Sequence, residues 1–146
     1  MNVTITPKPL EGTITPPPSK SQAHRLLLAA ALSGGVSLLS GLAQSQDIAA
    51  TLSCLRALGT GVEEAGPGAL RIHGLGCSIP QAGPFPVFDC GESGSTLRFL
   101  IPVALVAAGG GRFTGRGRLM ERPQGPYFAL FEEEGVSYER TGGFLT

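Results

Sequence analysis

The sequence has no excess of charge of either sign. Lys and Arg number 11 and Asp and Glu number 11 among 146 residues, so no overall electric field draws the chain to nucleic acid or to a membrane surface. Aromatic residues are also scarce, at 6%, and no platform for stacking nucleic-acid bases is evident. The composition therefore disfavours nucleic acid and membranes as partners.

Patterns for binding metals and for forming disulfides are missing as well. The three cysteines, Cys54, Cys77 and Cys90, are odd in number and include no CxxC pair. The two histidines, His24 and His73, cannot complete a zinc site and are expected to be structural. We therefore expect no metal and no cofactor, and a reducing, cytoplasmic setting.

Long apolar runs and a leader segment are absent too. The longest apolar stretch, 99–108, is interrupted by Pro102 and is shorter than the roughly 20 residues that a membrane span needs. No basic segment followed by an apolar run opens the chain, so no signal peptide is expected. With 22 glycines, 12 prolines and 42% hydrophobic residues, the chain is instead predicted to be a compact fold with many turns.

Hydrophobic periodicity predicts an α/β (α+β) fold in which short strands and helices alternate. The expected helices are 21–32, 46–58, 95–108 and 126–134. The expected strands are 3–6, 12–15, 36–40, 62–64, 70–73, 87–88, 112–114 and 136–139, with a turn at 141–143. Ser45 or Asp47 could cap the second helix.

The order of these elements occurs twice, which indicates an internal duplication. Two serines precede an arginine in 19–25, and the same residue types occur in 93–98. The segments 41–62 and 115–136 are equal in length, begin with glycine and end with valine. A unit of strand, helix, strand, helix, strand and strand accounts for this pattern. Since isolated units of this kind rarely bury their faces, the chain is expected to be part of a longer protein.

The first candidate motif lies between the prolines 16–18 and the apolar run 26–32. Prolines prevent a helix before the motif and the apolar run favours one after it, so Lys20, Ser21 and Arg25 fall in the first turns of a helix. Backbone N–H groups lack partners there and the helix dipole is positive. Cations at this place indicate an anion that compensates them; the ordinary alternative is a serine cap with solvated charges.

A second motif, 89–98, combines glycines with hydroxyl side chains immediately before a helix. Gly91 and Gly94 free the backbone, and the hydroxyl groups come from Ser93, Ser95 and Thr96. Such a loop can direct N–H groups at a phosphate or a carboxylate, although a simple capping turn is an equal alternative. Cys90 is expected to be a small buried residue, because no base lies near it in the sequence.

The third motif, 115–123, carries three arginines around a turn. Arg116, Arg118 and Arg122 could grasp a carboxylate or phosphate in bidentate fashion. The alternative is a solvated loop. Arg122 is the best placed of the three, because it precedes a proline and is held extended.

Taken in order, the three motifs resemble the N-terminal third of the 5-enolpyruvylshikimate-3-phosphate synthases. They read Pro-Ser-Lys-Ser-x-x-x-Arg from residue 18, Gly-x-Ser-Gly-Ser-Thr-x-Arg-Phe from residue 91 and Glu-Arg-Pro from residue 121. The resemblance implies transfer of a carboxyvinyl group from phosphoenolpyruvate to the 5-hydroxyl of shikimate 3-phosphate, with release of phosphate. That transferase step belongs to the shikimate pathway to chorismate and the aromatic amino acids.

The resemblance also implies site residues. Those facing shikimate 3-phosphate are Lys20, Ser21 and Arg25. Those facing phosphoenolpyruvate are Lys20, Gly94 and Arg122, with Arg98 as a possible support. In this family the catalytic acid and base come mainly from the second domain, so no catalytic residue is assigned in this chain, and the chain alone is expected to be inactive.

In fold, the resemblance implies part of the inside-out α/β barrel of the enolpyruvyl transferases. Residues 16–146 would form two of the three repeat units of the N-terminal, substrate-binding domain. The strands in residues 1–15 could belong with the missing second domain, which is the expected partner of this chain in a monomeric full-length enzyme. The open alternative is a non-catalytic anion-binding or interaction module with the same repeats.

Overall fold

The computed structural model describes residues 2–9, 11–76 and 83–146; Cys77 lies outside them. The helices are α1 (Lys20–Leu32), α2 (Gln46–Ala57), α3 (Gly94–Ala108) and α4 (Gly125–Glu134), with a 3₁₀ turn η1 (Leu119–Glu121). The strands are β1 (Val36–Leu39), β2 (Gly61–Glu64), β3 (Leu70–His73), β4 (Val87–Asp89), β5 (Arg112–Thr114), β6 (Arg140–Thr141) and β7 (Phe144–Leu145). The predicted α/β class is confirmed, and each predicted helix forms with its ends within one residue of those expected.

The strands form two sheets that share an order. In the first, β3 pairs antiparallel with both neighbours in the order β1-β3-β2. In the second, the order is β4-β5-β7-β6, where β4 runs parallel to β5 and the other pairs are antiparallel. The three strands β5, β7 and β6 therefore repeat the arrangement of β1, β3 and β2, and β4 is an additional edge strand.

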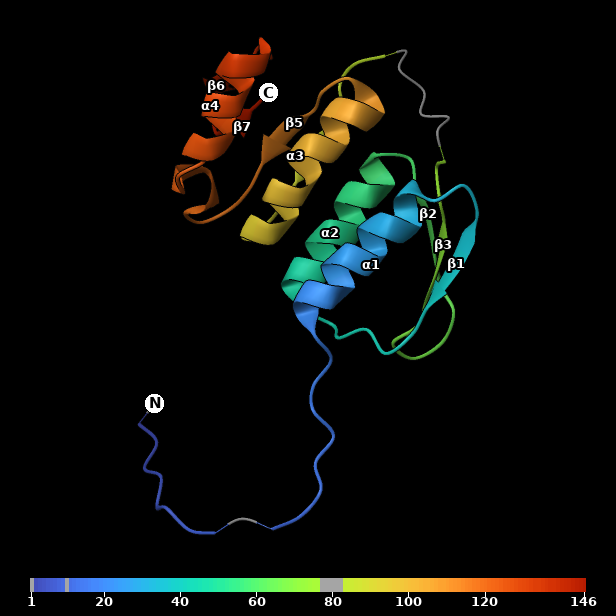
Figure 1. The fold of residues 1–146 in the computed structure, drawn as a ribbon, viewed down its shortest axis with the longest axis vertical. Coiled ribbons are helices and arrows are strands. Elements are labelled where there is room, and N and C mark those ends of the chain that lie inside the picture. The colour runs from blue at the N-terminus through green and yellow to red at the C-terminus, as the bar shows by residue number, and fades with distance from the viewer. Residues whose placement is uncertain (1, 10, 77–82) are drawn as a thin grey trace.

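The helices α1, α2 and α3 form one layer beside the first sheet. Figure 1 shows α1, α2 and α3 side by side, with their N-terminal ends on the same side of the molecule. The first sheet flanks α1 and α2, and the second sheet and α4 lie beyond α3. The buried face of α1 repeats at helical spacing through Ala23, Leu27, Ala30 and Ala31. No helix in the described part of the chain is both long and apolar enough to cross a membrane.

Three strand predictions, 3–6, 12–15 and 136–139, are wrong. Residues 2–9 and 11–15 form no strand, and Ile14 is 86% exposed; the segment runs away from the helices (Figure 1) and meets no strand that could pair with it. The segment 136–139 is not a strand either, because the N–H of Val136 donates to the carbonyl oxygen of Phe131 and so ends α4.

The predicted turn at 141–143 is confirmed. Glu139 and Thr146 exchange two backbone hydrogen bonds, and β6 then pairs with β7 across Gly142 and Gly143, whose φ angles are 61° and 82°. Two successive positive φ angles are the geometry of a two-residue hairpin turn that favours glycine. The glycines therefore set where the hairpin closes.

Gly74 provides a test of how the first sheet packs on α1. Its N–H donates to Gly35, and a methyl group at Gly74 would overlap the carbonyl oxygen of Ser33 and lie 2.5 Å from that of Ala30. We expect Gly74→Ala to lower the free energy of unfolding by about 1–3 kcal/mol, because backbone has to move. Urea denaturation measures this.

Gly34→Ala is the matched control, because a methyl group there would meet nothing within 4 Å. Its free energy of unfolding should change by only a few tenths of a kcal/mol, roughly, or rise slightly. Equal destabilisation by the two substitutions would contradict the packing of β3 beneath α1.

Candidate functional site

Three helix starts meet at one end of the helical layer. Each is capped by a serine hydroxyl: Ser19 accepts from the N–H of Gln22 at 3.3 Å, and Ser45 and Ser93 make the corresponding bonds at 3.2 Å. Ser45, rather than Asp47, is therefore the cap of α2. The remaining first-turn N–H groups make this end of the layer electropositive.

A buried chain of hydrogen bonds connects the three helices behind their starts. His24 Nδ1 on α1 lies 2.8 Å from Thr51 Oγ1 on α2, and Thr51 Oγ1 lies 2.8 Å from Thr96 Oγ1 on α3. Thr96 Oγ1 continues to Ser93 Oγ at 2.7 Å. All four side chains are at most 2% exposed. Sequence reasoning identified His24 as structural, and the structure agrees.

Lys20 is held by a carboxylate that sequence reasoning considered only as a cap. Lys20 Nζ lies 2.6 Å from Asp47 Oδ2. The carbonyl oxygen of Asp47 also faces the buried chain, because it lies 3.1 Å from Thr51 Oγ1 and 3.4 Å from Thr96 Oγ1. Asp47 thus joins the start of α1 to the polar interior.

Gly94, Arg98 and Arg122 come together at the start of α3, although Arg122 is far from the other two in sequence. A methyl group on Gly94 would lie 3.0 Å from Arg122 Nη1 and 3.7 Å from Arg98 Nη1. Within residues 2–9, 11–76 and 83–146, neither guanidinium is paired with a carboxylate. Two uncompensated cations therefore flank the backbone at a helix start, which is suited to a carboxylate or phosphate.

The other two arginines of the third motif are occupied. Arg116 Nη2 lies 3.3 Å from Asp89 Oδ2, and Arg118 Nε lies 3.4 Å from Glu121 Oε2. Exposed pairs of this kind are weak, but they direct both side chains to local carboxylates. Among the three arginines of this motif, Arg122 is the one that lies beside Gly94.

Ser21 and Arg25 lie on one exposed face of α1, one turn apart. The Arg25 guanidinium is 6.0 Å from the centre of the Phe99 ring on α3. Because Phe99 follows Arg98 directly, this contact places the cation of α1 beside the start of α3. The structure thus gathers the predicted residues at the same end of the layer, in two groups with Asp47 between them.

Some predicted contributors are not available to a ligand. The hydroxyls of Ser93 and Thr96 are buried among the hydrogen bonds that join the helices, so of the three hydroxyl-bearing residues of that loop only Ser95 is exposed. Cys90 is fully buried, and the hydrogen bond with Cys54 together with burial raises the pKa of its thiol. A neutral, buried thiol is no nucleophile, as the sequence predicted.

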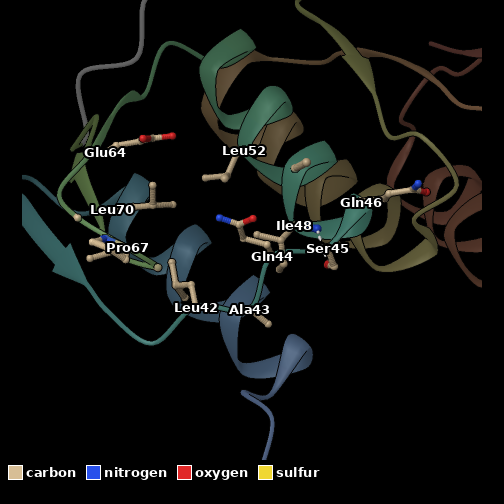
Figure 2. A pocket seen from close by; sticks show the side chains of 14 residues that line it. Leu42, Ala43, Gln44, Ser45, Gln46, Ile48, Leu52, Glu64, Pro67 and Leu70 are labelled. Atoms are coloured by element: carbon tan, nitrogen blue, oxygen red, sulfur yellow. Dashed lines mark hydrogen bonds between the residues drawn. The ribbon is translucent and has the colours of Figure 1, made fainter.

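The structure also contains an apolar cleft that is separate from these cations. The cleft, of about 820 Å³, lies between the start of α2 and the turn that joins β2 to β3. Figure 2 shows Leu42, Ile48 and Leu70 lining it, with Glu64 as its one acidic residue. It contains no Lys or Arg, so it is not suited to an anion. Among the described residues, no group of three or more His, Cys, Asp or Glu is placed to hold a metal ion.

Comparison with known proteins gives a consistent family. Residues 5–145 match the family described as EPSP synthase (3-phosphoshikimate 1-carboxyvinyltransferase). The chain is 43% identical over 136 residues to the 3-phosphoshikimate 1-carboxyvinyltransferase of a Clostridium perfringens strain, covering 93% of this chain and 31% of that protein. The chain is 38% identical over 151 residues to the 3-phosphoshikimate 1-carboxyvinyltransferase of Clostridium beijerinckii, covering 99% of this chain and 34% of that protein.

A solved structure agrees with these relatives. The EPSP synthase from Acinetobacter baumannii superposes with a TM-score of 0.76 and 27% identity, covering 92% of this chain and 31% of that one. The chain therefore spans about a third of the length of the relatives it matches. The solved structure contains an arrangement like this one in about a third of its chain.

The pH dependence of stability tests the environment of His24. Burial lowers the pKa of His24 below its usual 6.5, Asp47 acts in the opposite direction, and Lys20 lowers it further. The unfolded chain therefore binds more protons below pH 6.5 than the folded chain, and the free energy of unfolding falls as the pH falls below that value. We expect a smaller fall in His24→Gln when urea denaturation is compared at about pH 7.5 and about pH 5.

The pH dependence of the free energy of unfolding should differ between the unchanged chain and His24→Gln by no more than about 1.4 kcal/mol per pH unit. His73→Gln is the control, since it removes the other histidine, which lies beside Glu63 on the first sheet. An unchanged pH dependence in His24→Gln would contradict a buried, neutral His24.

Proposed function

The chain belongs to the EPSP synthase (3-phosphoshikimate 1-carboxyvinyltransferase) family, and we propose that it forms one wall of the site for that transfer. In the proposed reaction, the carboxyvinyl group of phosphoenolpyruvate passes to the 5-hydroxyl of shikimate 3-phosphate, and phosphate leaves. The step belongs to the shikimate pathway to chorismate and the aromatic amino acids. The observation that carries the proposal is that the guanidinium groups of Arg98 and Arg122 lie beside Gly94 without a carboxylate partner among the described residues.

We propose that α1 binds shikimate 3-phosphate through Lys20, Ser21 and Arg25. The hydroxyl and the guanidinium lie on one exposed face, and neither Ser21 nor Arg25 is tied to a carboxylate within the described ranges. A phosphate can accept from both groups at once. Lys20 would contact both substrates, with its ammonium located by Asp47.

We propose that the start of α3 binds phosphoenolpyruvate. Arg122 would supply the principal cation and Arg98 would support it. Gly94 is buried beneath the Arg122 guanidinium, and because it has no side chain, that cation can lie close to the first turn of α3, where the anion would bind. The same donors would stabilise the negative charge of a tetrahedral adduct, so that this wall contributes position and charge.

The proposed catalytic acid and base lie in the rest of the longer protein. In that protein, residues 16–146 would be two of three repeat units in an inside-out α/β barrel, a view supported by the shared strand order of the two sheets. Residues 1–15 would pair with the second domain, which their exposure here favours. The full-length form would be a monomer, and the free thiols of Cys54 and Cys90 favour a reducing, cytoplasmic setting.

Calorimetry of the chain with shikimate 3-phosphate tests the substrate assignment. Arg25→Ala should weaken binding by about 1.5–3 kcal/mol, the contribution of a charge-assisted hydrogen bond. Arg56→Ala, in the last turn of α2, is the matched control and should leave the affinity unchanged. Equal affinity for inorganic phosphate would favour a general anion-binding module instead, and phosphate release by the chain alone would contradict a missing acid and base.

Gly94→Ala tests the second subsite in the full-length protein that carries this segment. Its methyl group would crowd Arg122, so KM for phosphoenolpyruvate should rise more than KM for shikimate 3-phosphate. Gly125→Ala, at the first position of α4, meets nothing within 4 Å and should leave both constants unchanged. Equal effects of Gly94→Ala on the two Michaelis constants would contradict the assignment.

A further inference from the structure

His24, Thr51 and Thr96 occupy positions in the helical layer that apolar side chains of similar shape could fill. Burying polar atoms is costly unless each is paired, and these three pair with one another across both helix interfaces. We propose that they are positioning residues, which fix the starts of α1, α2 and α3 relative to one another. The expected effect of these residues on ligand binding rests on the proposed function.

The three helices need such a constraint because their dipoles are nearly parallel. Their positive ends lie on one side (Figure 1) and repel one another. The polar chain acts close to these ends. Thr96 bonds Ser93, the cap directly before Gly94, and Thr51 donates to the carbonyl oxygen of Asp47. These two bonds connect the buried hydrogen bonds to Ser93, which precedes Gly94, and to Asp47, which pairs with Lys20.

The location of the His24 proton decides which group donates in each hydrogen bond that joins the three helices. His24 Nε2 is buried and has no hydrogen-bond partner among the described residues, whereas Nδ1 faces Thr51 at 2.8 Å. A buried N–H without an acceptor is rarer than a buried acceptor without a donor. The proton therefore belongs on Nδ1 and is donated to Thr51 Oγ1. The Thr51 hydroxyl can then donate to the carbonyl oxygen of Asp47 or to Thr96 Oγ1. The Thr96 hydroxyl can donate to Ser93 Oγ.

Nitrogen-15 spectroscopy of the His24 ring tests this assignment of donors in the unchanged chain. We expect the shifts of a neutral ring protonated at Nδ1, which is the less common tautomer in water and which a merely space-filling histidine would not adopt. A proton on Nε2 would overturn the inference. Because no ligand is present, this result does not depend on the proposed function.

Removal of the Thr51 hydroxyl tests the positioning role. Thr51→Val should shift the amide resonances of Lys20 and Gly94, on the two neighbouring helices, and Thr51→Ser should restore them. It should also weaken shikimate 3-phosphate binding by roughly two- to tenfold, the range that corresponds to one neutral hydrogen bond. If the valine variant does not fold, Thr51→Ala, which also lacks the hydroxyl, takes its place, with Thr51→Ser as the same rescue.

Thr60→Val is the matched control. Thr60 is also buried, at 4% exposed, but its hydroxyl has no partner in the described part of the chain, so its loss should leave both resonances and the affinity unchanged. Unshifted Lys20 and Gly94 resonances in Thr51→Val would overturn the positioning role. If the resonances move but the unchanged chain binds no shikimate 3-phosphate, the proposed function fails and the positioning role stands.

Discussion

Three helices that point the same way bring their positive ends together, and the rest of the structure depends on how this repulsion is offset. Each start has a serine cap, and buried hydroxyls join the helices across their interfaces. The sheets lie outside the layer of α1, α2 and α3 (Figure 1), and Ile72 of β3 and Phe88 of β4 belong to the same buried core as the apolar residues of the helices. Without the direct bonds from α2 to its neighbours, apolar packing alone would have to oppose the dipoles at close range.

The same constraint explains how a chain with no net charge can attract anions. Its 11 cations and 11 anions cancel overall, yet Arg25, Arg98 and Arg122 lie at the electropositive end of the helices without carboxylate partners in the described ranges. A cation close to a helix start opposes the dipole of that helix. The proposed phosphate or carboxylate would offset this unfavourable interaction, and the arginines would in turn stabilise the bound anion.

Features that depend on neighbouring residues could be predicted from the sequence, whereas features that depend on contacts between distant residues could not. Helices formed as expected because caps and periodicity are local signals. The strands at 3–6 and 12–15 did not form, since a strand needs a partner in space as well as a pattern. In the site, motifs indicated Gly94 and Arg122, but nothing local connects Lys20 with Asp47, 27 residues away. Thr51 is a polar residue within an apolar helix face, and this feature of the sequence could have indicated a buried hydrogen bond there.

The cations of the site differ in what they can contribute. The Lys20 ammonium has a fixed partner 2.6 Å away, so its position is defined but the Asp47 carboxylate cancels much of its field. Arg122 has no such partner among the described residues and keeps its full charge beside Gly94. A site that must hold two anions near each other needs both properties, since a located donor sets geometry and an uncompensated cation supplies attraction. Because Asp47 takes part in locating Lys20 and also bonds the buried hydroxyls, the geometry of the ligands is coupled to the packing of the three helices.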